Sequence, residues 1–225
     1  MPFADSVIDL SHFNQHLDFD KAKTDQISGV FHKATQGTSF FDPTYAEHCA
    51  LASKAGLLWG AYHFGTGADG LEQAEFFLEK VQPGRATLLA LDLEANPQGP
   101  SMTLEEARAF VTHIQAVTGR WPGLYAGAYL KQLLGVTTDP VLGKCWFWLS
   151  QYGPTPVIPP NWKNWTLWQY TDGAAGPGAC PVDGIGRCDR SKFNGSQADL
   201  IAFWNAGAVR LDLPLSVSAT AGPTT

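Results

Sequence analysis

Leu88-Leu89-Ala90-Leu91-Asp92-Leu93-Glu94-Ala95-Asn96-Pro97 is an apolar run that ends in two carboxylates one residue apart. Pro83-Gly84 precedes it and Asn96-Pro97 breaks it, so its length is typical of a strand rather than a helix. Side chains at i and i+2 point to the same side of a strand, so we expect Asp92 and Glu94 to share a face. In an isolated Asp-x-Glu, both acids would simply be solvated at the start of a loop. The rest of the chain decides between these interpretations.

Strand-like and helix-like segments alternate through most of the chain. We expect further strands over 3–10, 29–35, 57–64, 123–126, 145–150 and 165–170. Helix-starting signals separate them: a capping box at Thr103-Leu104-Glu105-Glu106, an acid cap at Asp69, and Asp42-Pro43 opening a helix that Gly56 closes. Shorter helices are expected over 19–27, 129–134 and 198–204.

This alternation favours parallel βαβ units that close into a barrel. The stretch 142–189 holds strands with little helix between them. The expected fold is therefore α/β, an irregular TIM-like β/α barrel depleted in helices in its second half. We expect one catalytic barrel over residues 1–210, followed at 211–225 by a linker-like tail rich in Ser, Thr, Ala, Pro and Gly.

The active sites of such barrels lie at the carboxyl ends of the strands. Polar and aromatic side chains gather at or near those ends in this sequence: Asp9, Lys33, His63, Asp92, Glu94, Tyr125 and Trp148. A pair of merely solvated acids does not predict this convergence. The eight tryptophans of the chain add flat apolar faces that could stack on a ligand in a cleft, with core packing as the alternative for each.

Composition excludes several classes of function. The net charge is −6 and the isoelectric point is near 5.4, so the chain offers no basic surface for a nucleic acid and no basic helix for a membrane surface. No apolar run approaches the length of a membrane span, and Met1 to Val7 lacks the basic region of a secretory signal peptide.

The four cysteines show no spacing typical of zinc or of a redox dithiol, so we expect no metal site. Cys180 and Cys188 flank a glycine-rich loop, and the sequence leaves open whether they form a disulfide.

Acids that converge on an aromatic-lined groove suit glycoside hydrolysis, which needs one protonated and one ionised carboxyl group. The sequence shows no nucleophilic Cys-His pair and no G-x-S-x-G motif. Seven motifs then follow one another in order: Val7-Ile8-Asp9-Leu10-Ser11, Phe31-His32-Lys33-Ala34-Thr35-Gln36-Gly37, Gly60-Ala61-Tyr62-His63-Phe64, Leu91-Asp92-Leu93-Glu94, Leu124-Tyr125, Trp148-Leu149-Ser150-Gln151-Tyr152 and Leu167-Trp168-Gln169-Tyr170-Thr171. In order and spacing they resemble glycoside hydrolase family 25, the N-acetylmuramidase lysozymes, over nearly the whole chain to about Trp204.

The resemblance implies cleavage of the β-1,4 bond between N-acetylmuramic acid and N-acetylglucosamine, with no cofactor. Glu94 would be the general acid. Asp92 would stay ionised, either as the nucleophile or as the group that stabilises the substrate's own 2-acetamido group during its attack. Asp9 and Asp189 would hold this pair and the sugar in place, although the surroundings of Asp189 depart from the family's usual pattern.

The resemblance also implies residues that line the groove: Tyr62, Tyr125, Trp148 and Gln169. Lys33 and His63 are further candidates for substrate binding; the alternatives are a structural ion pair for Lys33 and packing for His63.

The expected partner is the glycan strand of peptidoglycan, and we expect a monomer. Such an enzyme would be made in the cytoplasm and act on the wall after lysis or specialised export, as a phage endolysin or as an effector with an immunity protein or export machinery. Two other functions stay open. One is another endo-N-acetylhexosaminidase such as a chitinase, although the D-x-x-D-x-D-x-E arrangement is missing. The other is a non-catalytic wall-binding module.

Overall fold

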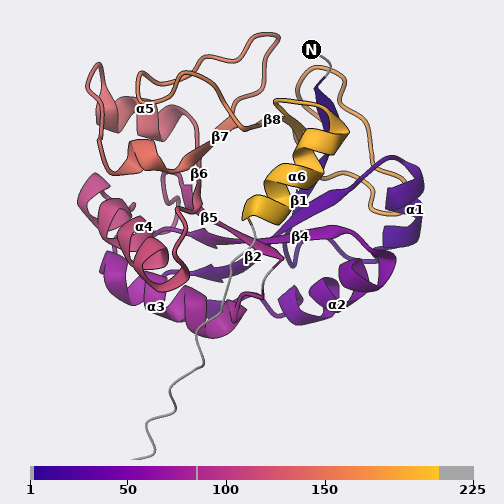
Figure 1. The fold of residues 1–225 in the computed structure, drawn as a ribbon, viewed down its shortest axis with the longest axis horizontal. Helices are drawn as coiled ribbons and strands as arrows, with labels where there is room; N and C mark the ends of the chain where they lie inside the picture. Colours follow the sequence, from indigo (N-terminus) through magenta and orange to yellow (C-terminus); the bar gives the residue numbers. More distant parts are fainter. Residues whose placement is uncertain (1–2, 85, 208–225) are drawn as a thin grey trace, which may run out of the picture.

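Eight strands close into a barrel in the computed structural model, which describes residues 3–84 and 86–207 (Figure 1). The closed order is β1-β2-β4-β5-β6-β7-β8-β9, and β9 pairs back with β1. The barrel strands are β1 (Ala4–Leu10), β2 (Gly29–Gln36), β4 (Leu58–Phe64), β5 (Thr87–Leu93), β6 (Gly123–Ala126), β7 (Trp146–Ser150), β8 (Leu167–Thr171) and β9 (Asp189–Phe193). The two-residue strand β3 (Phe40–Phe41) pairs with β2 outside the closed ring. The predicted barrel is confirmed.

The last barrel strand runs in the opposite direction to the others. β9 is antiparallel to both β8 and β1, whereas the remaining barrel pairs are parallel. Its first residue, Asp189, pairs with Asp9 near the end of β1. The amino end of β9 therefore lies at the same rim as the carboxyl ends of the parallel strands. The sequence predicted no strand here, only a loop leading to Asp189.

The helices lie mainly in the first half of the chain. They are α1 (Phe19–Thr24), α2 (Tyr45–Ala55), α3 (Gly70–Val81), α4 (Leu104–Thr118), α5 (Ala128–Leu134) and α6 (Gln197–Gly207), with a 3₁₀ turn at Leu142–Lys144. The connections at 151–166 and 172–188, both fully described, contain no helix. The predicted depletion of helices in the second half is thus confirmed.

Helix starts agree with the sequence at two sites and differ at a third. Thr103 and Glu106 form the expected capping box of α4, and Asp69 caps α3. The helix α2 and its predicted end at Gly56 are confirmed, but its predicted start at Asp42-Pro43 was wrong, because Thr44 is the N-cap and the helix begins at Tyr45. The Asp42 carboxylate instead accepts hydrogen bonds from Thr44 and from His12, in the loop after β1, so it joins two loops at the rim.

Helix α6 covers the amino end of the barrel (Figure 1). Its Trp204 is fully buried, packs on Phe31 inside the barrel, and donates its indole N–H to the carbonyl oxygen of Trp59 at 3.0 Å. Gly29, at the start of β2, leaves room for this ring, since a Cβ there would lie 2.8 Å from it. With the amino end filled, the carboxyl rim is the end of the barrel left for a site.

Cys180 and Cys188 both carry free thiols in the structure, so the disulfide that the sequence left open is not formed. The Cys180 sulfur instead accepts a hydrogen bond from the Arg190 guanidinium at 3.4 Å.

The predicted tail at 211–225 lies outside the described residues. No helix among residues 3–84 and 86–207 combines the length and the apolar character needed to cross a bilayer.

Candidate active site

Eight of the ten predicted site residues line one small cavity of about 130 Å³ at the carboxyl rim. Each belongs to a strand of the barrel or directly follows one, so the closure of the barrel brings them together. The lining residues are Asp9, Tyr62, Asp92, Glu94, Tyr125, Trp148, Gln169 and Asp189.

The alternation of β5 explains how its two acids reach this cavity. Leu89, Leu91 and Leu93 belong to the apolar layer under the helices, whereas Leu88 and Ala90 belong to the cluster inside the barrel. Asp92 continues the inward-facing series, and Glu94 follows the last residue of the strand with the same parity. The shared face predicted from the opening stretch is what the structure shows.

Hydrogen bonds fix Asp9 and Asp189. The Gln169 side-chain amide donates to both oxygens of Asp9, at 3.2 and 3.0 Å, and the Tyr152 hydroxyl donates to Asp189 Oδ1 at 3.0 Å. Gln169 is oriented in turn by the Tyr125 hydroxyl, which donates to its amide oxygen at 2.9 Å. In contrast, Oδ1 of Asp92 is buried and has no hydrogen-bond partner among the described residues.

Burial raises the pKa of all four carboxyl groups, and repulsion by a neighbouring carboxylate adds to each shift. Burial is the larger cause for Asp9 and Asp92, whose pKa values rise well above the usual range; repulsion by Asp189 adds to the shift of Asp9, and repulsion by Glu94 to that of Asp92. Burial also raises the pKa of Glu94, with Asp189 as the second cause, and burial raises the pKa of Asp189. The four groups therefore share protons, because neighbouring buried carboxylates do not all ionise together.

The four acids differ in what favours their ionised forms. The hydrogen bond from Gln169 lowers the pKa of Asp9, the charge of Lys33 lowers that of Asp92, and the hydrogen bond from Tyr152 lowers that of Asp189, each against the effect of burial. For Glu94, both causes of the pKa shift raise it. Glu94 is thus the acid with no neighbour that opposes its protonation.

The Trp148 ring serves both the core and the site. It is only 1% exposed and packs on Phe31 inside the barrel, yet it also forms part of the cavity wall. Its indole N–H donates to Ser191 Oγ at 2.9 Å, and the Tyr125 ring meets it edge-on with centroids 4.9 Å apart. These contacts hold the wall of the cavity rigidly.

Lys33 does not line the acid cavity but an adjacent groove of about 500 Å³. We call this hollow the Lys33 groove; its lining includes Phe13, Lys33, Gln36, Phe40, Phe64 and Gln98.

The structure does not bring His63 to the site. Tyr62 faces the cavity, so its neighbour His63 faces the helices and is fully buried. Its ring stacks on Phe110 with centroids 4.9 Å apart, and its nitrogens lie 2.8 Å from Thr35 Oγ1 and 3.1 Å from Gln73 Oε1. His63 therefore belongs to the packing between sheet and helices, outside the site expected from the sequence.

Tyr152 is a site residue that the sequence analysis did not assign. Its hydroxyl contacts Asp189, although its ring lies in the connection after β7. The signal was present in the motif Trp148-Leu149-Ser150-Gln151-Tyr152, because Trp148 already pointed to this end of β7.

No group of three or more His, Cys, Asp or Glu side chains in residues 3–84 and 86–207 is arranged to hold a metal ion. The chemistry available in the cavity is that of carboxyl groups, phenols and amides.

Comparison with known proteins agrees with this geometry. Residues 8–179 match the family model "Glycosyl hydrolases family 25". The chain is 30% identical over 213 residues to Lysozyme M1 of Streptomyces globisporus, covering 88% of this chain and 70% of that protein.

Solved structures show the same fold. A bacterial lysozyme from Streptomyces coelicolor superposes with a TM-score of 0.78 at 31% identity, covering 89% of this chain and 97% of that one. A family GH25 lysozyme from Aspergillus fumigatus gives a TM-score of 0.77, also at 31% identity, covering 92% of this chain and 100% of that one. The chain thus belongs to glycosyl hydrolases family 25 and is a glycoside hydrolase of the lysozyme type.

Proposed function

We propose that this enzyme is an N-acetylmuramidase that hydrolyses the β-1,4 bond between N-acetylmuramic acid and N-acetylglucosamine in peptidoglycan. The observation that carries the proposal is the cavity itself, in which Asp92 and Glu94 meet Asp9 and Asp189 beside aromatic side chains. Hydrolysis of a glycosidic bond needs a protonated and an ionised carboxyl group in one place. Membership of a family with lysozyme and muramidase relatives supports the choice of substrate.

Glu94 is the proposed general acid. Burial and repulsion by Asp189 raise its pKa with no opposing neighbour, which favours a bound proton. The pKa values of Asp9 and Asp92 rise well above their usual range as well, so the choice of Glu94 rests on its place at the end of the motif Leu91-Asp92-Leu93-Glu94. In the first step this proton passes to the glycosidic oxygen while the bond from that oxygen to the anomeric carbon breaks. The leaving sugar departs with a free hydroxyl, and Glu94 is left as a carboxylate.

Asp92 is proposed to act in its ionised form. Burial and repulsion by Glu94 raise its pKa, and the nearby positive charge of Lys33 opposes that rise. Its buried Oδ1 has no partner among the described residues and can accept the N–H of the substrate's 2-acetamido group. The acetamido oxygen would then attack the anomeric carbon, and water activated by Glu94 would open the cyclic intermediate. In the alternative route, Asp92 itself forms the bond to that carbon.

The other polar residues of the cavity are proposed to position the substrate and the acid pair. Asp9, held by Gln169, and Asp189, held by Tyr152, flank Asp92 and Glu94, while Tyr62, Tyr125 and Trp148 would contact the sugar. All of these side chains come from one chain, which supports a monomer as the active form.

Analysis of the products from purified sacculi tests the proposed function. A muramidase leaves N-acetylmuramic acid at each new reducing end, whereas new reducing ends of N-acetylglucosamine would contradict the proposal. A chitinase would release soluble sugar from chitin oligomers instead. Retention of the protein on sacculi without any release of reducing ends would indicate a binding module.

A further inference from the structure

The Lys33 groove is built by residues that follow the residues of the acid cavity in the chain or pair with them in the sheet. Phe13 follows Asp9 by four residues, Phe64 follows Tyr62 by two, and Gln98 follows Glu94 by four. On the sheet, Lys33 pairs with Tyr62, and Phe64 pairs with Asp92. The groove therefore leads away from the acid cavity along the β1, β2, β4 and β5 side of the rim.

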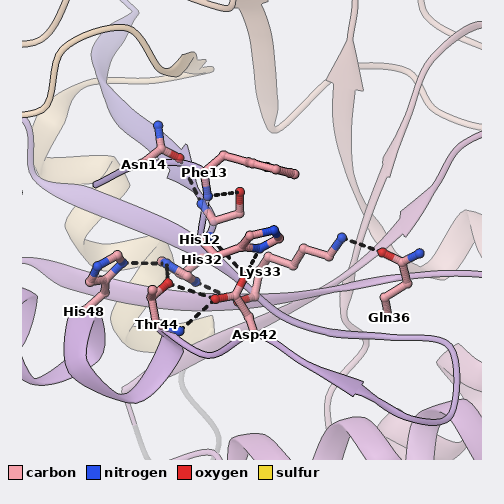
Figure 2. Close-up of polar contacts among 10 residues, drawn as sticks. His12, Phe13, Asn14, His32, Lys33, Gln36, Asp42, Thr44 and His48 are labelled. Carbon is pink, nitrogen blue, oxygen red and sulfur yellow. Dashed lines mark hydrogen bonds and ion pairs between the residues drawn. The ribbon is translucent and has the colours of Figure 1, made fainter. Parts of the chain in front are cut away.

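Among the described residues, no carboxylate lies within 4.0 Å of the Lys33 ammonium, although the charges of Asp92 and Asp42 act on it from farther away. It lies 5.5 Å from the centre of the Phe40 ring and 5.1 Å from that of Phe64. It also donates a hydrogen bond to Gln36 Oε1 at 2.6 Å, and Figure 2 shows this contact. An ammonium group has three donors, so donor capacity remains. Burial lowers the pKa of Lys33, because it removes water from the charged ammonium. An anionic ligand beside the ammonium would favour its charged form and oppose this lowering.

The opposite wall of the groove is held in place by Asp42. Its Oδ2 accepts from the backbone N–H of His12 at 3.0 Å and lies 2.8 Å from His12 Nδ1 (Figure 2). The His12 ring packs at a tilt against Phe13, with centroids 4.1 Å apart. Phe13 is nevertheless 82% exposed, which leaves a fixed apolar face at the edge of the groove.

We infer that the Lys33 groove binds the acidic peptide stem carried by the muramic acid residues of the substrate, with the Lys33 ammonium paired to a stem carboxylate. This inference rests on the proposed muramidase function. A short peptide offers what the groove can recognise: amide groups for Gln36 and Gln98, small apolar side chains for Phe13 and Phe40, and a negative charge for Lys33. The four acids of the neighbouring cavity would repel the stem carboxylate. The positive charge of Lys33 offsets this repulsion on the side where the peptide extends from the sugar.

The experiment measures kcat/KM for release of reducing ends from three soluble glycan substrates. The first bears intact peptide stems, the second bears stems whose carboxylates are converted to amides, and the third has lost its stems to an amidase and carries free lactyl carboxylates. Each is tested with the wild type, with Lys33→Met and with Lys144→Met. Lys144 is the matched control, because its ammonium also lies over an aromatic ring, that of Trp121, but precedes the amino end of β7 at the far side of the barrel.

We expect the wild type and Lys144→Met to prefer the acidic stems over the amidated stems about tenfold, equivalent to about 1.4 kcal/mol. Lys33→Met should cleave both at similar rates. Equal rates of the wild type on these two substrates would overturn the inference, as would an unchanged preference in Lys33→Met. In a further outcome, the wild type prefers the glycan without stems over the amidated stems just as strongly, and this preference is lost in Lys33→Met. That result would mean that Lys33 pairs with the lactyl carboxylate, and it would overturn the inference of a stem-binding groove. If the wild type released no reducing ends from any substrate, the proposed function itself would fail.

Discussion

The side-chain amide of Gln169 donates to both carboxylate oxygens of Asp9, across 160 residues of sequence. The amide oxygen of the same side chain accepts from the Tyr125 hydroxyl, so Gln169 is locked with its N–H groups toward Asp9. Both oxygens of Asp9 are thereby occupied as acceptors, which favours the ionised form of this acid. The contact helps to decide which of the four carboxyl groups carry charge.

Replacing Gln169 with leucine should show this effect in the pH dependence of catalysis. Without the two donated hydrogen bonds, the pKa of Asp9 rises further, because the bonds favour its ionised form. The acidic limb of the kcat/KM profile should then move to higher pH by about one unit. The profile is measured on soluble peptidoglycan fragments. An acidic limb at the same pH in the variant and the wild type would show that the hydrogen bonds from Gln169 do not set the pKa of Asp9.

Asp92→Asn should make the protein more stable while it inactivates the enzyme. The pKa of Asp92 is raised above its usual value of 3.8 in the folded state, so the wild type loses stability as the pH rises from about 4 toward the folded-state pKa. The neutral variant avoids this loss. At pH 7 we expect its free energy of unfolding to exceed that of the wild type by about 0.5–2 kcal/mol.

Urea unfolding at several pH values measures this difference. The advantage of Asp92→Asn should grow from pH 4 upward and vanish below it. A variant less stable than the wild type at pH 7 would mean that the Asp92 carboxylate is stabilised by its surroundings.

His63→Gln tests the assignment of His63 to the packed layer. Burial lowers the pKa of His63 from 6.5 to about 4, so its contribution to stability is complete above pH 6.5 and is lost as the pH falls toward 4. We expect the variant to be about 1–3 kcal/mol less stable than the wild type at pH 7, because it loses the contacts with Thr35 and Gln73. This difference in stability should become smaller as the pH falls from 6.5 toward 4. KM for soluble glycan should stay within about twofold of the wild-type value, since the ring lies outside the cavity. A large increase in KM without a loss of stability would show that His63 takes part in substrate binding.

The acids of the site could be predicted from the sequence because they interrupt apolar strands. The parity of Leu88, Ala90, Asp92 and Glu94 placed both acids on the inward face, and the structure agrees. The same parity rule, applied to Tyr62 and His63, assigns them to opposite faces of β4. The location of His63 was therefore available from the sequence once Tyr62 was placed in the groove.

Strand β9 could not be predicted by an apolar pattern, because two of its five residues are the cations Arg190 and Lys192. Tertiary contacts stabilise them: the Arg190 guanidinium lies 3.7 Å from Asp5, and the Lys192 ammonium lies 4.2 Å from the centre of the Tyr170 ring. These partners are distant in sequence. The antiparallel pairing of β9 with β1 and β8, which brings Asp189 to the rim, likewise joins segments that are distant in sequence.

The most direct test of the central claim compares the wild type with Glu94→Gln on purified sacculi, measured as the rate at which muramic acid reducing ends appear. Gln keeps the shape of Glu94 but cannot donate the acid proton, so we expect the rate to fall about 10²–10⁴-fold with the melting temperature unchanged or higher. Glu75→Gln, at an exposed position of α3, serves as the control and should match the wild type. A Glu94→Gln variant that is folded and releases muramic acid ends at the wild-type rate would contradict the account.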